Sequence, residues 1–301
     1  MTPLPPEVRI REVGPRDGLQ AEQPVPVADR VRLVEALADA GLREIEAISF
    51  VSPAAVPSMA GAADVLHGLR RRDDVSYVAL VPNLKGAELA LEAGVDGLNV
   101  TISASPVYNE KNVNRTIAES LEGIGAICRR VGGLWVDVTV SCAFGSPYEG
   151  DIDPAEVAAL GRAAREAGAT SLTFADTTGM ATPRRVADLI DEVGSSVRLH
   201  FHETRGTGLL NAFAALQLGV ADFDTSVGGL GGSPFAAGAA GNLATEGLVH
   251  LLDDLGVASG VDLERLLDAV AVARDVVGHE LPSPIAVAGP RRRRAAGGDA
   301  S

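Results

Sequence analysis

Hydrophobic and polar positions change their period repeatedly along the chain. Short β-branched runs typical of buried strands alternate with longer stretches whose apolar residues recur at helical spacing. The expected strands are residues 8–14, 43–50, 75–81, 97–103, 134–143, 171–177, 197–203 and 222–228. The expected helices are residues 27–40, 60–71, 85–93, 116–131, 154–167, 183–193, 209–218, 243–255 and 262–277.

Eight strand–helix units in about 250 residues predict an α/β fold, the (β/α)8 TIM barrel. A doubly wound open sheet is the structural alternative, but no GxGxxG fingerprint follows the first expected strand. No linker interrupts the pattern, so we expect one barrel domain with extra C-terminal helices over residues 1–288. Residues 289–301 are rich in arginine and glycine, and we expect a disordered tail there.

The composition suits a large soluble domain. Of 301 residues, 46% are hydrophobic, and the mean hydropathy of +0.16 allows a sizeable core. The formal net charge is -14, and residues 291–301 carry four arginines and one aspartate, so the first 290 residues carry -17. This charge argues against nucleic acid or an anionic membrane as a partner. With no signal-peptide pattern, no long apolar span and two cysteines, we expect a cytoplasmic protein.

The most informative stretch is residues 197–204, where His200 and His202 stand two apart in an expected strand. Because side chains in a strand alternate between faces, both imidazoles should point the same way. Their Cα atoms would be roughly 6–7 Å apart, which allows both rings to bind one metal ion. Two polar residues that hydrogen-bond to neighbours near a strand end are the alternative interpretation of the pair alone.

Polar residues are frequent where the expected strands end, which is the catalytic end of a barrel. Asp17 follows the first strand and is a candidate third metal ligand, and Arg16 would place a permanent cation beside it. A surface ion pair is the alternative for these two. The other polar candidates at strand ends are Glu46, Ser49, Asn83, Cys142 and Asp176. Of these, Glu46, Ser49 and Asp176 alternatively form polar layers that only hydrogen-bond to each other.

Glycines crowd residues 228–241, which predicts a mobile loop at the end of the eighth strand. A tight turn with close backbone approach is the alternative. Asn242 comes next, either as the N-cap of the following helix or as an amide ligand. With Asp17, His200 and His202 it makes a set of two nitrogens and two oxygens without a thiolate. Such a set suits Mg²⁺, Mn²⁺ or Co²⁺ better than structural zinc.

These residues lie in blocks that match a known family. The blocks are EVGPRDGLQ (12–20), EAISFVSP (46–53), PNLKG (82–86), VSCAFGSPYEG (140–150), FADTTG (174–179), HFHET (200–204) and GGLGGSPFAAGAAGNLATE (228–246). In order and spacing, over about residues 8–280, they resemble the hydroxymethylglutaryl-CoA lyase family. The wider group comprises metal-dependent barrel acyl-CoA lyases and Claisen-type synthases. The resemblance implies retro-Claisen cleavage of 3-hydroxy-3-methylglutaryl-CoA to acetyl-CoA and acetoacetate.

The resemblance also implies roles for single residues. Asp17, both histidines of the HFH motif and Asn242 match the family's ligands for its divalent cation. Arg16 matches the arginine that stabilises the enolate of the departing acetyl-CoA. The base would be His200 or Asp17, and two acidic residues in strands would support the site; these are Glu46 and Asp176.

Other contacts with an acyl-CoA substrate are expected from position. Ser49 and Cys142 end strands that face the site. Lys85 and Lys111, the two lysines of the chain, follow the third and fourth strands and are candidates for binding the CoA phosphates. Ordinary surface lysines are the alternative. We expect a homodimer or a higher homo-oligomer, and neither nucleic acid nor membrane as a partner.

Two positions depart from the family pattern. Ser233 stands where the family has a cysteine assigned to proton transfer, and an alcohol is a far weaker acid than a thiol. Arg205 stands where the family usually has an aromatic residue. Both departures keep two alternatives open. One is a related lyase or synthase for a different 3-hydroxyacyl-CoA, and the other is a catalytically impaired homologue that binds acyl-CoA.

Overall fold

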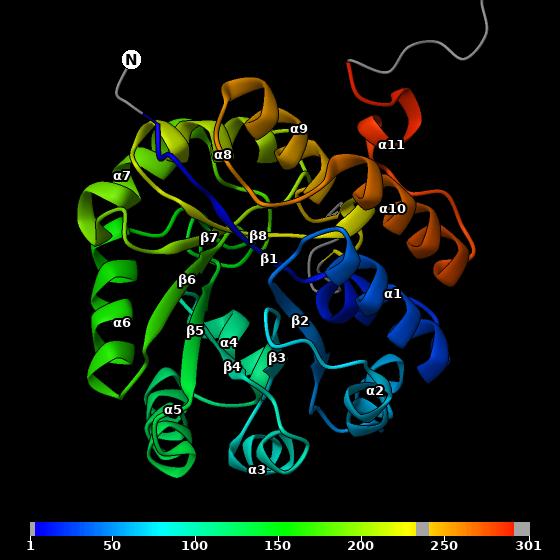
Figure 1. The fold of residues 1–301 in the computed structure, drawn as a ribbon. Coiled ribbons are helices and arrows are strands. Elements are labelled where there is room, and N and C mark those ends of the chain that lie inside the picture. Colours follow the sequence, from blue (N-terminus) through cyan, green and yellow to red (C-terminus); the bar gives the residue numbers. More distant parts are fainter. Residues whose placement is uncertain (1–3, 233–240, 292–301) are drawn as a thin grey trace, which may run out of the picture.

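The computed structural model describes residues 4–232 and 241–291. Within these residues, eight parallel strands close into a barrel in sequence order, and β1 pairs with β8. The strands are β1 (Arg9–Glu12), β2 (Glu44–Ser49), β3 (Ser76–Leu80), β4 (Gly97–Ser103), β5 (Trp135–Ser141), β6 (Ser171–Ala175), β7 (Arg198–His200) and β8 (Asp222–Thr225). The (β/α)8 fold predicted from the hydrophobic pattern is therefore confirmed (Figure 1).

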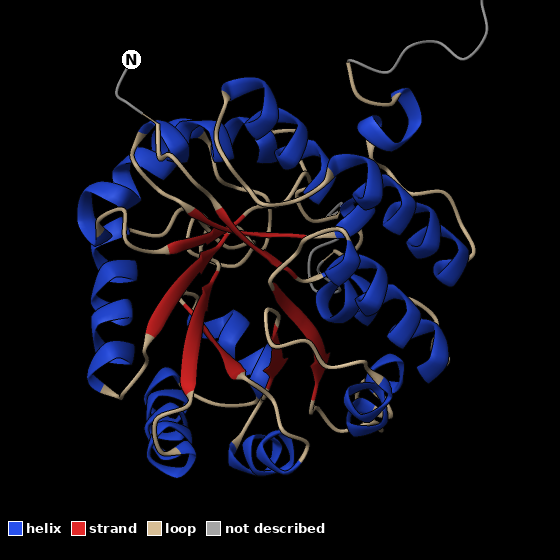
Figure 2. Ribbon diagram, in the orientation of Figure 1, coloured by secondary structure: helices blue, strands red, loops and turns tan. Residues whose placement is uncertain are grey.

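Most of the helices form an outer layer around the strands (Figure 2), whereas α4 lies inside this layer (Figure 1). They are α1 (Val27–Asp39), α2 (Ala62–Gly68), α3 (Leu84–Glu92), α4 (Pro106–Val113), α5 (Ile117–Val131), α6 (Pro154–Glu166), α7 (Pro183–Val193), α8 (Gly208–Gln217), α9 (Thr245–Leu255), α10 (Leu263–Val277) and α11 (Pro284–Ala288). Short turns of other helix types are η1 (Gly14–Gly18), η2 (Pro57–Met59) and η3 (Val227–Gly229). Across the described ranges, we find no helix with the length and apolarity required to cross a membrane.

Local sequence signals set the helix ends. At the start of α5, Thr116 and Glu119 form a capping box, in which each side chain binds the other residue's backbone N–H. The same helix ends at Gly132, whose φ of 57° lies in the left-handed region. At α7, Thr182 accepts a hydrogen bond from the backbone of Arg185. These short-range rules explain why helix positions follow so directly from the sequence.

The alternation within β5 separates the apolar core around the barrel from the polar interior of the barrel. Val136, Val138 and Val140 are buried in the hydrophobic core. Between them, Asp137 and Thr139 make hydrogen bonds to side chains of other strands across the barrel interior. The interior of this barrel is therefore polar over much of its length, and the apolar core surrounds it.

The structure differs from the sequence expectations mainly at element ends. The expected strand 197–203 ends at His200, and His202 instead forms an isolated bridge with Asn242. Helix α9 begins at Thr245 with Ala244 as its N-cap, so the interpretation of Asn242 as an N-cap is wrong. Helix α4 was missed because it is short and amphipathic patterning needs more turns to be recognised.

Candidate functional site

A cavity of about 210 Å³ opens at the carboxyl ends of the strands. Its polar wall includes Arg16, Asp17, Gln20, Asn99, Thr101, Asn112, Thr139, Ser141, Thr177, His200, His202 and Asp224. The apolar part of the wall is formed by Val51, Val56, Leu80, Val81, Pro82, Tyr108, Val113 and Ala175. The cavity thus lies where barrel enzymes place their chemistry, and it combines ionisable groups with an apolar wall.

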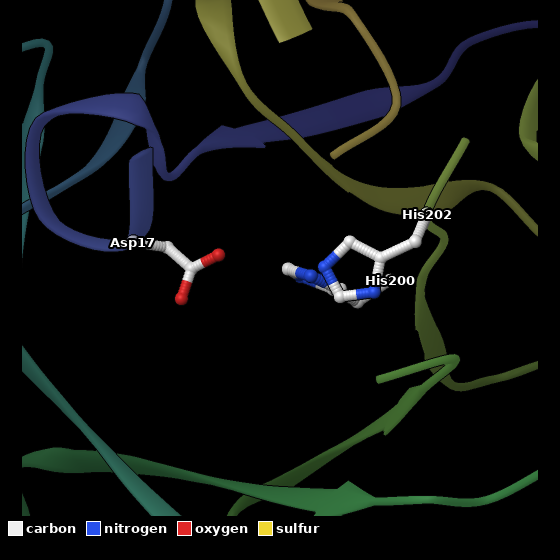
Figure 3. A group of neighbouring side chains, drawn as sticks. All are labelled: Asp17, His200 and His202. Atoms are coloured by element: carbon white, nitrogen blue, oxygen red, sulfur yellow. The ribbon is translucent and has the colours of Figure 1, made fainter. Parts of the chain in front are cut away.

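Three of the expected metal ligands meet at this cavity. Asp17, His200 and His202 each offer one ligand atom, and these atoms lie within 4.8 Å of one another. Figure 3 shows the carboxylate of Asp17 facing the two imidazoles. The ring centroids of the histidines are 5.1 Å apart, and the rings are almost perpendicular at 80°. The arrangement predicted from the two-residue spacing therefore exists, with Asp17 supplied by η1.

Each histidine is oriented by an acceptor on its Nδ1 atom. His200 Nδ1 lies 3.2 Å from Asp224 Oδ2, and His202 Nδ1 lies 2.7 Å from the main-chain oxygen of Asp176. With Nδ1 occupied in this way, Nε2 is the nitrogen of each ring that can bind a cation. Burial lowers the pKa of His202 to about 4, so its imidazole is neutral at physiological pH and suited to metal binding.

The surroundings of Asp17 favour the ionised form of its carboxylate. Burial raises the pKa of Asp17, but the charges of Arg16 and His200 outweigh burial and hold it below its usual value. Arg16 Nη1 donates to Asp17 Oδ1 at 2.6 Å. The ionised Asp17 and the neutral imidazole of His202 are in the protonation states that a divalent cation requires. Burial lowers the pKa of His200, but the Asp224 and Asp17 carboxylates outweigh it and raise this pKa, so His200 would release a proton when a cation binds.

Asn242 lies beside this set. Its Nδ2 donates to Asp17 Oδ2 at 2.8 Å and to the Leu230 oxygen at 2.9 Å. Its Oδ1 is buried and has no hydrogen-bond partner among the described residues. A bound cation would satisfy this oxygen, so the donor set fits the expected divalent ion. Gly241 is required for the approach, because a Cβ there would lie 1.7 Å from the Gly229 oxygen.

Arg16 is held from a second side. Its Nε donates to Glu46 Oε1, and Asn99 Nδ2 donates to Glu46 Oε2 at 2.6 Å. Thr139 Oγ1 in turn donates to Asn99 Oδ1 at 2.9 Å. This chain of hydrogen bonds runs from η1 across β2 and β4 to β5. Glu46 therefore orients the one arginine side chain of the described cavity wall.

Two other acidic or polar candidates lie outside the cavity wall formed by the described residues. The Asp176 carboxylate accepts from the Met180 and Ala181 amides at 2.6 and 2.9 Å, and burial raises its pKa to about 7. Asp176 thus reaches the site through its main-chain oxygen on His202. Ser49 is fully buried, and its Oγ has no hydrogen-bond partner among the described residues.

The remaining candidates differ in their exposure. Cys142 follows β5 with a φ of 56°, and burial raises the pKa of its thiol to about 12. Its neighbour Ser141 lines the cavity instead. Lys85 lies in the first turn of α3 and Lys111 in α4, both exposed, and the Lys111 ammonium lies over the Tyr148 ring. Ser233, the candidate proton donor, lies outside the described residues.

Sequence reasoning missed Asp224, which lines the cavity and contacts His200. The available signal was the alternation in Asp222-Phe223-Asp224-Thr225, because Phe223 is fully buried and its neighbours must face the other way. It also missed Asn99 and Thr139, which stand at inward positions of β4 and β5. Inward polar positions of this kind are recognised only after strand register is known.

Two buried carboxylates hold the chain segments that carry the site. Glu12 accepts from the backbone N–H groups of Gly14 and Val227 and from the Thr245 hydroxyl. Glu246 accepts from the Gly228 amide. Burial raises the pKa of Glu12 to about 7, although the three hydrogen bonds oppose this shift. Glu12 therefore joins η1 to η3 in a way that depends on its protonation.

We expect the metal-free protein to lose stability between pH 5 and pH 8. Glu12 binds a proton in the folded state up to about pH 7, while in the unfolded chain it has lost this proton above about pH 4.5. Its contribution is fully present below the unfolded pKa and is lost as pH rises through the folded one. Glu12→Gln should flatten the pH dependence of the unfolding free energy by up to about 1.4 kcal/mol per pH unit.

Urea denaturation at pH 5, 6, 7 and 8 measures this slope. Glutamine can keep the same contacts, because its oxygen accepts from the two amides and its amide donates to the Thr245 hydroxyl. Glu192→Gln, at an exposed glutamate of α7, is the matched control and should leave the slope unchanged. Equal slopes for Glu12→Gln and the parent would contradict the shift assigned to Glu12.

Taken together, the barrel and its site define a class: a (β/α)8-barrel enzyme with a candidate divalent-cation centre. Comparison with known proteins agrees with this class and identifies the family within it. The HMGL-like family model matches residues 7–273. The chain belongs to the HMGL-like family, which the motifs of the sequence predicted.

The similar proteins carry consistent names. A Pseudomonas aeruginosa protein named 3-hydroxy-3-isohexenylglutaryl-CoA/hydroxy-methylglutaryl-CoA lyase is 47% identical over 274 residues, covering 88% of this chain and 91% of that protein. Human mitochondrial hydroxymethylglutaryl-CoA lyase is 43% identical over 279 residues, covering 89% and 85%. A solved HMG-CoA lyase from Acinetobacter baumannii, in complex with coenzyme A and 3-methylmalate, is 40% identical with a TM-score of 0.92, covering 98% and 99%.

Proposed function

We propose that this protein cleaves 3-hydroxy-3-methylglutaryl-CoA to acetyl-CoA and acetoacetate in a reaction that depends on a divalent metal. The observation that carries the proposal is the meeting of Asp17, His200 and His202 with the Arg16 side chain on the wall of one cavity. The names of the similar proteins, which are hydroxymethylglutaryl-CoA lyases, support the same reaction.

Asp17, His200, His202 and Asn242 are the proposed metal ligands. Oxygen and imidazole donors without a thiolate favour Mg²⁺ or Mn²⁺, and Co²⁺ is the next choice. When bound there, a divalent cation would supply Lewis acidity that lowers the pKa of the substrate's tertiary hydroxyl. The ligands come from η1, from the end of β7 and from the segment after Gly241, so the closed barrel is needed to assemble them.

The residues of the chain then move the proton and meet the new charge. Asp17 takes the proton of the C3 hydroxyl, whose electron pair forms the ketone of acetoacetate. His200, the other base that the family suggests, has its Nδ1 atom at Asp224 and would bind the cation through Nε2. The bond between C2 and C3 breaks, and its electrons pass to the thioester as an enolate. The guanidinium of Arg16, fixed by Glu46, is the donor for the enolate oxygen. Protonation of the enolate carbon completes acetyl-CoA.

Ser233 occupies the position from which the family delivers that proton. If a hydroxyl serves poorly there, Ser233→Cys should raise turnover of hydroxymethylglutaryl-CoA several-fold, because a thiol is the stronger acid. Ser233→Ala should cost little. Steady-state kinetics of both variants measure this. If the alanine variant is inactive and the cysteine variant is not faster, Ser233 is adapted to another substrate.

Lys85 and Lys111 are the proposed contacts for the phosphates of CoA. Reversing both charges to glutamate should raise the apparent KM for the acyl-CoA about tenfold at low salt, and less at high salt because exposed charges are screened. Arg162→Glu, at an exposed position of α6, is the control for a general change of charge. An unchanged KM in the double variant would remove the two lysines from the site.

A related lyase for a larger acyl group is the second candidate function. The cavity has an apolar wall, formed in part by Val51, Val56 and Val113. Such a wall would accept a longer hydrocarbon substituent at C3. The two candidates are separated by kcat/KM for 3-hydroxyglutaryl-CoA esters whose C3 substituent is lengthened from methyl.

The homo-oligomer expected from the sequence stays a prediction, which light scattering would test.

A coupled assay tests the proposed reaction. The protein is stripped of metal, reloaded with Mg²⁺ or Mn²⁺ and supplied with hydroxymethylglutaryl-CoA, and acetoacetate is followed by its reduction with NADH. We expect acetoacetate from the reloaded protein and none from the stripped one. Metal binding without cleavage of any ester in the series would instead support the catalytically impaired homologue.

A further inference from the structure

Asp224 connects the candidate cation site to a charged network in the barrel interior. Its Oδ2 lies 3.2 Å from His200 Nδ1, and its side chain is almost fully buried. Arg11 from β1 binds the same carboxylate in a bidentate manner. Its Nε donates to Oδ1 at 2.8 Å, and its Nη2 donates to Oδ2 at 2.7 Å. A carboxylate that accepts from two nitrogens of one guanidinium has a fixed orientation.

Arg11 is itself anchored on its other side. Its Nη1 donates to Asp137 Oδ2 at 3.0 Å, and its Nη2 donates to Thr173 Oγ1 at 3.1 Å. Thr173 Oγ1 also donates to Asp137 Oδ2 at 2.6 Å. Arg11, Asp137 and Thr173 are completely buried. The position of Asp224 is therefore determined by β1, β5 and β6 together, away from solvent.

This contact acts on a proposed metal ligand through its second nitrogen. An acceptor on Nδ1 selects the imidazole tautomer whose Nε2 lone pair is free for a cation, and it fixes the plane of the ring. His202 has a different acceptor, the main-chain oxygen of Asp176, which a side-chain substitution cannot remove. Only the His200 contact depends on a replaceable carboxylate among the described residues.

We propose that Asp224, held by Arg11, is a positioning residue that orients His200 for cation binding. The proposal rests on the cation site of the proposed function. A purely structural role for Asp224 is the alternative, and Asp137 provides the matched comparison. Asp137 is also fully buried and also binds Arg11, but among the described residues its carboxylate accepts hydrogen bonds from Arg11, Thr173 and Ser171, and His200 is not among its partners. Asp224→Asn and Asp137→Asn make the same chemical change in one network.

Mn²⁺ binding, measured by calorimetry and by the electron paramagnetic resonance spectrum, separates the two roles. We expect Asp224→Asn to bind Mn²⁺ 10- to 100-fold more weakly than the parent, which is the usual cost of losing such a partner. Asp137→Asn should stay within about threefold of the parent, although both variants lower the Tm. Equal affinities of both variants would overturn the proposal. A parent protein that does not bind Mn²⁺ would overturn the cation site itself.

A measurement on the unaltered protein covers the case in which Asp224→Asn does not fold. Long-range ¹H–¹⁵N correlation spectra of the Mg²⁺-loaded protein report which ring nitrogen carries the proton. We expect a proton on Nδ1 of His200, with Nε2 unprotonated. An unprotonated Nδ1 on His200 would contradict the proposal, because Asp224 could not then accept from it.

Discussion

Arg16→Gln should bind Mn²⁺ with nearly the parent affinity and lose about 10³-fold or more in kcat. Arg16 lines the cavity beside Asp17 and is 8% exposed, so its charge acts where water is scarce. Removing one preorganised neutral donor from an oxyanion site costs about 10²–10³ in rate, and a charged donor is worth more. The proposed enolate oxygen would lose its permanent cation, whereas the proposed metal ligands would all remain.

Two measurements isolate this effect. Calorimetry measures the affinity for Mn²⁺ and so shows whether Asp17 still binds the metal without Arg16, which in the parent contacts both Asp17 and Glu46. Arg9→Gln provides the matched control, because Arg9 is an exposed arginine near the amino end of β1 and pairs with Asp222. Its turnover should equal that of the parent. Near-normal turnover of Arg16→Gln would show that another group stabilises the enolate.

His202→Ala should lose metal and activity together. The substitution removes one of three groups whose ligand atoms lie within 4.8 Å of one another. We expect the affinity for Mn²⁺ to fall by 10²-fold or more and turnover to fall below detection at micromolar metal. Because burial already keeps His202 neutral, its loss leaves no unpaired buried charge, and the fold should persist.

The comparison for this prediction is another histidine. His67 is exposed on α2, so His67→Ala should keep both metal binding and turnover. Circular dichroism of both variants confirms that the barrel is intact. Full Mn²⁺ occupancy in His202→Ala would exclude this residue from the ligand set and would leave Asp17 and His200 without their proposed third partner.

The barrel was predictable because its rules are short-range. Strand and helix periods, the capping box at Thr116 and the glycine at Gly132 each involve a few neighbouring residues. The pairing of His200 with His202 followed from the strand period, although the strand ends at His200 and a bridge to Asn242 continues the extended backbone. Asp17 was placed correctly by the rule that barrel sites gather where strands end.

The direction of individual side chains was less predictable. Asp176 also stands at a strand end, yet its carboxylate turns to the Met180 and Ala181 amides. Asp224 was missed although it contacts His200, because its partner Arg11 is 213 residues away in sequence. Such contacts depend on register around the closed barrel, which a single sequence does not display. The role of Asn242 likewise depended on where α9 begins.

The central claim is that this site breaks a carbon–carbon bond, and product stoichiometry tests it most directly. The Mn²⁺-loaded protein is mixed with hydroxymethylglutaryl-CoA, and the products are quantified by mass spectrometry. We predict acetyl-CoA and acetoacetate in equal amounts, with neither formed by His202→Ala. Release of free CoA with hydroxymethylglutarate, or an unchanged substrate, would contradict the claim.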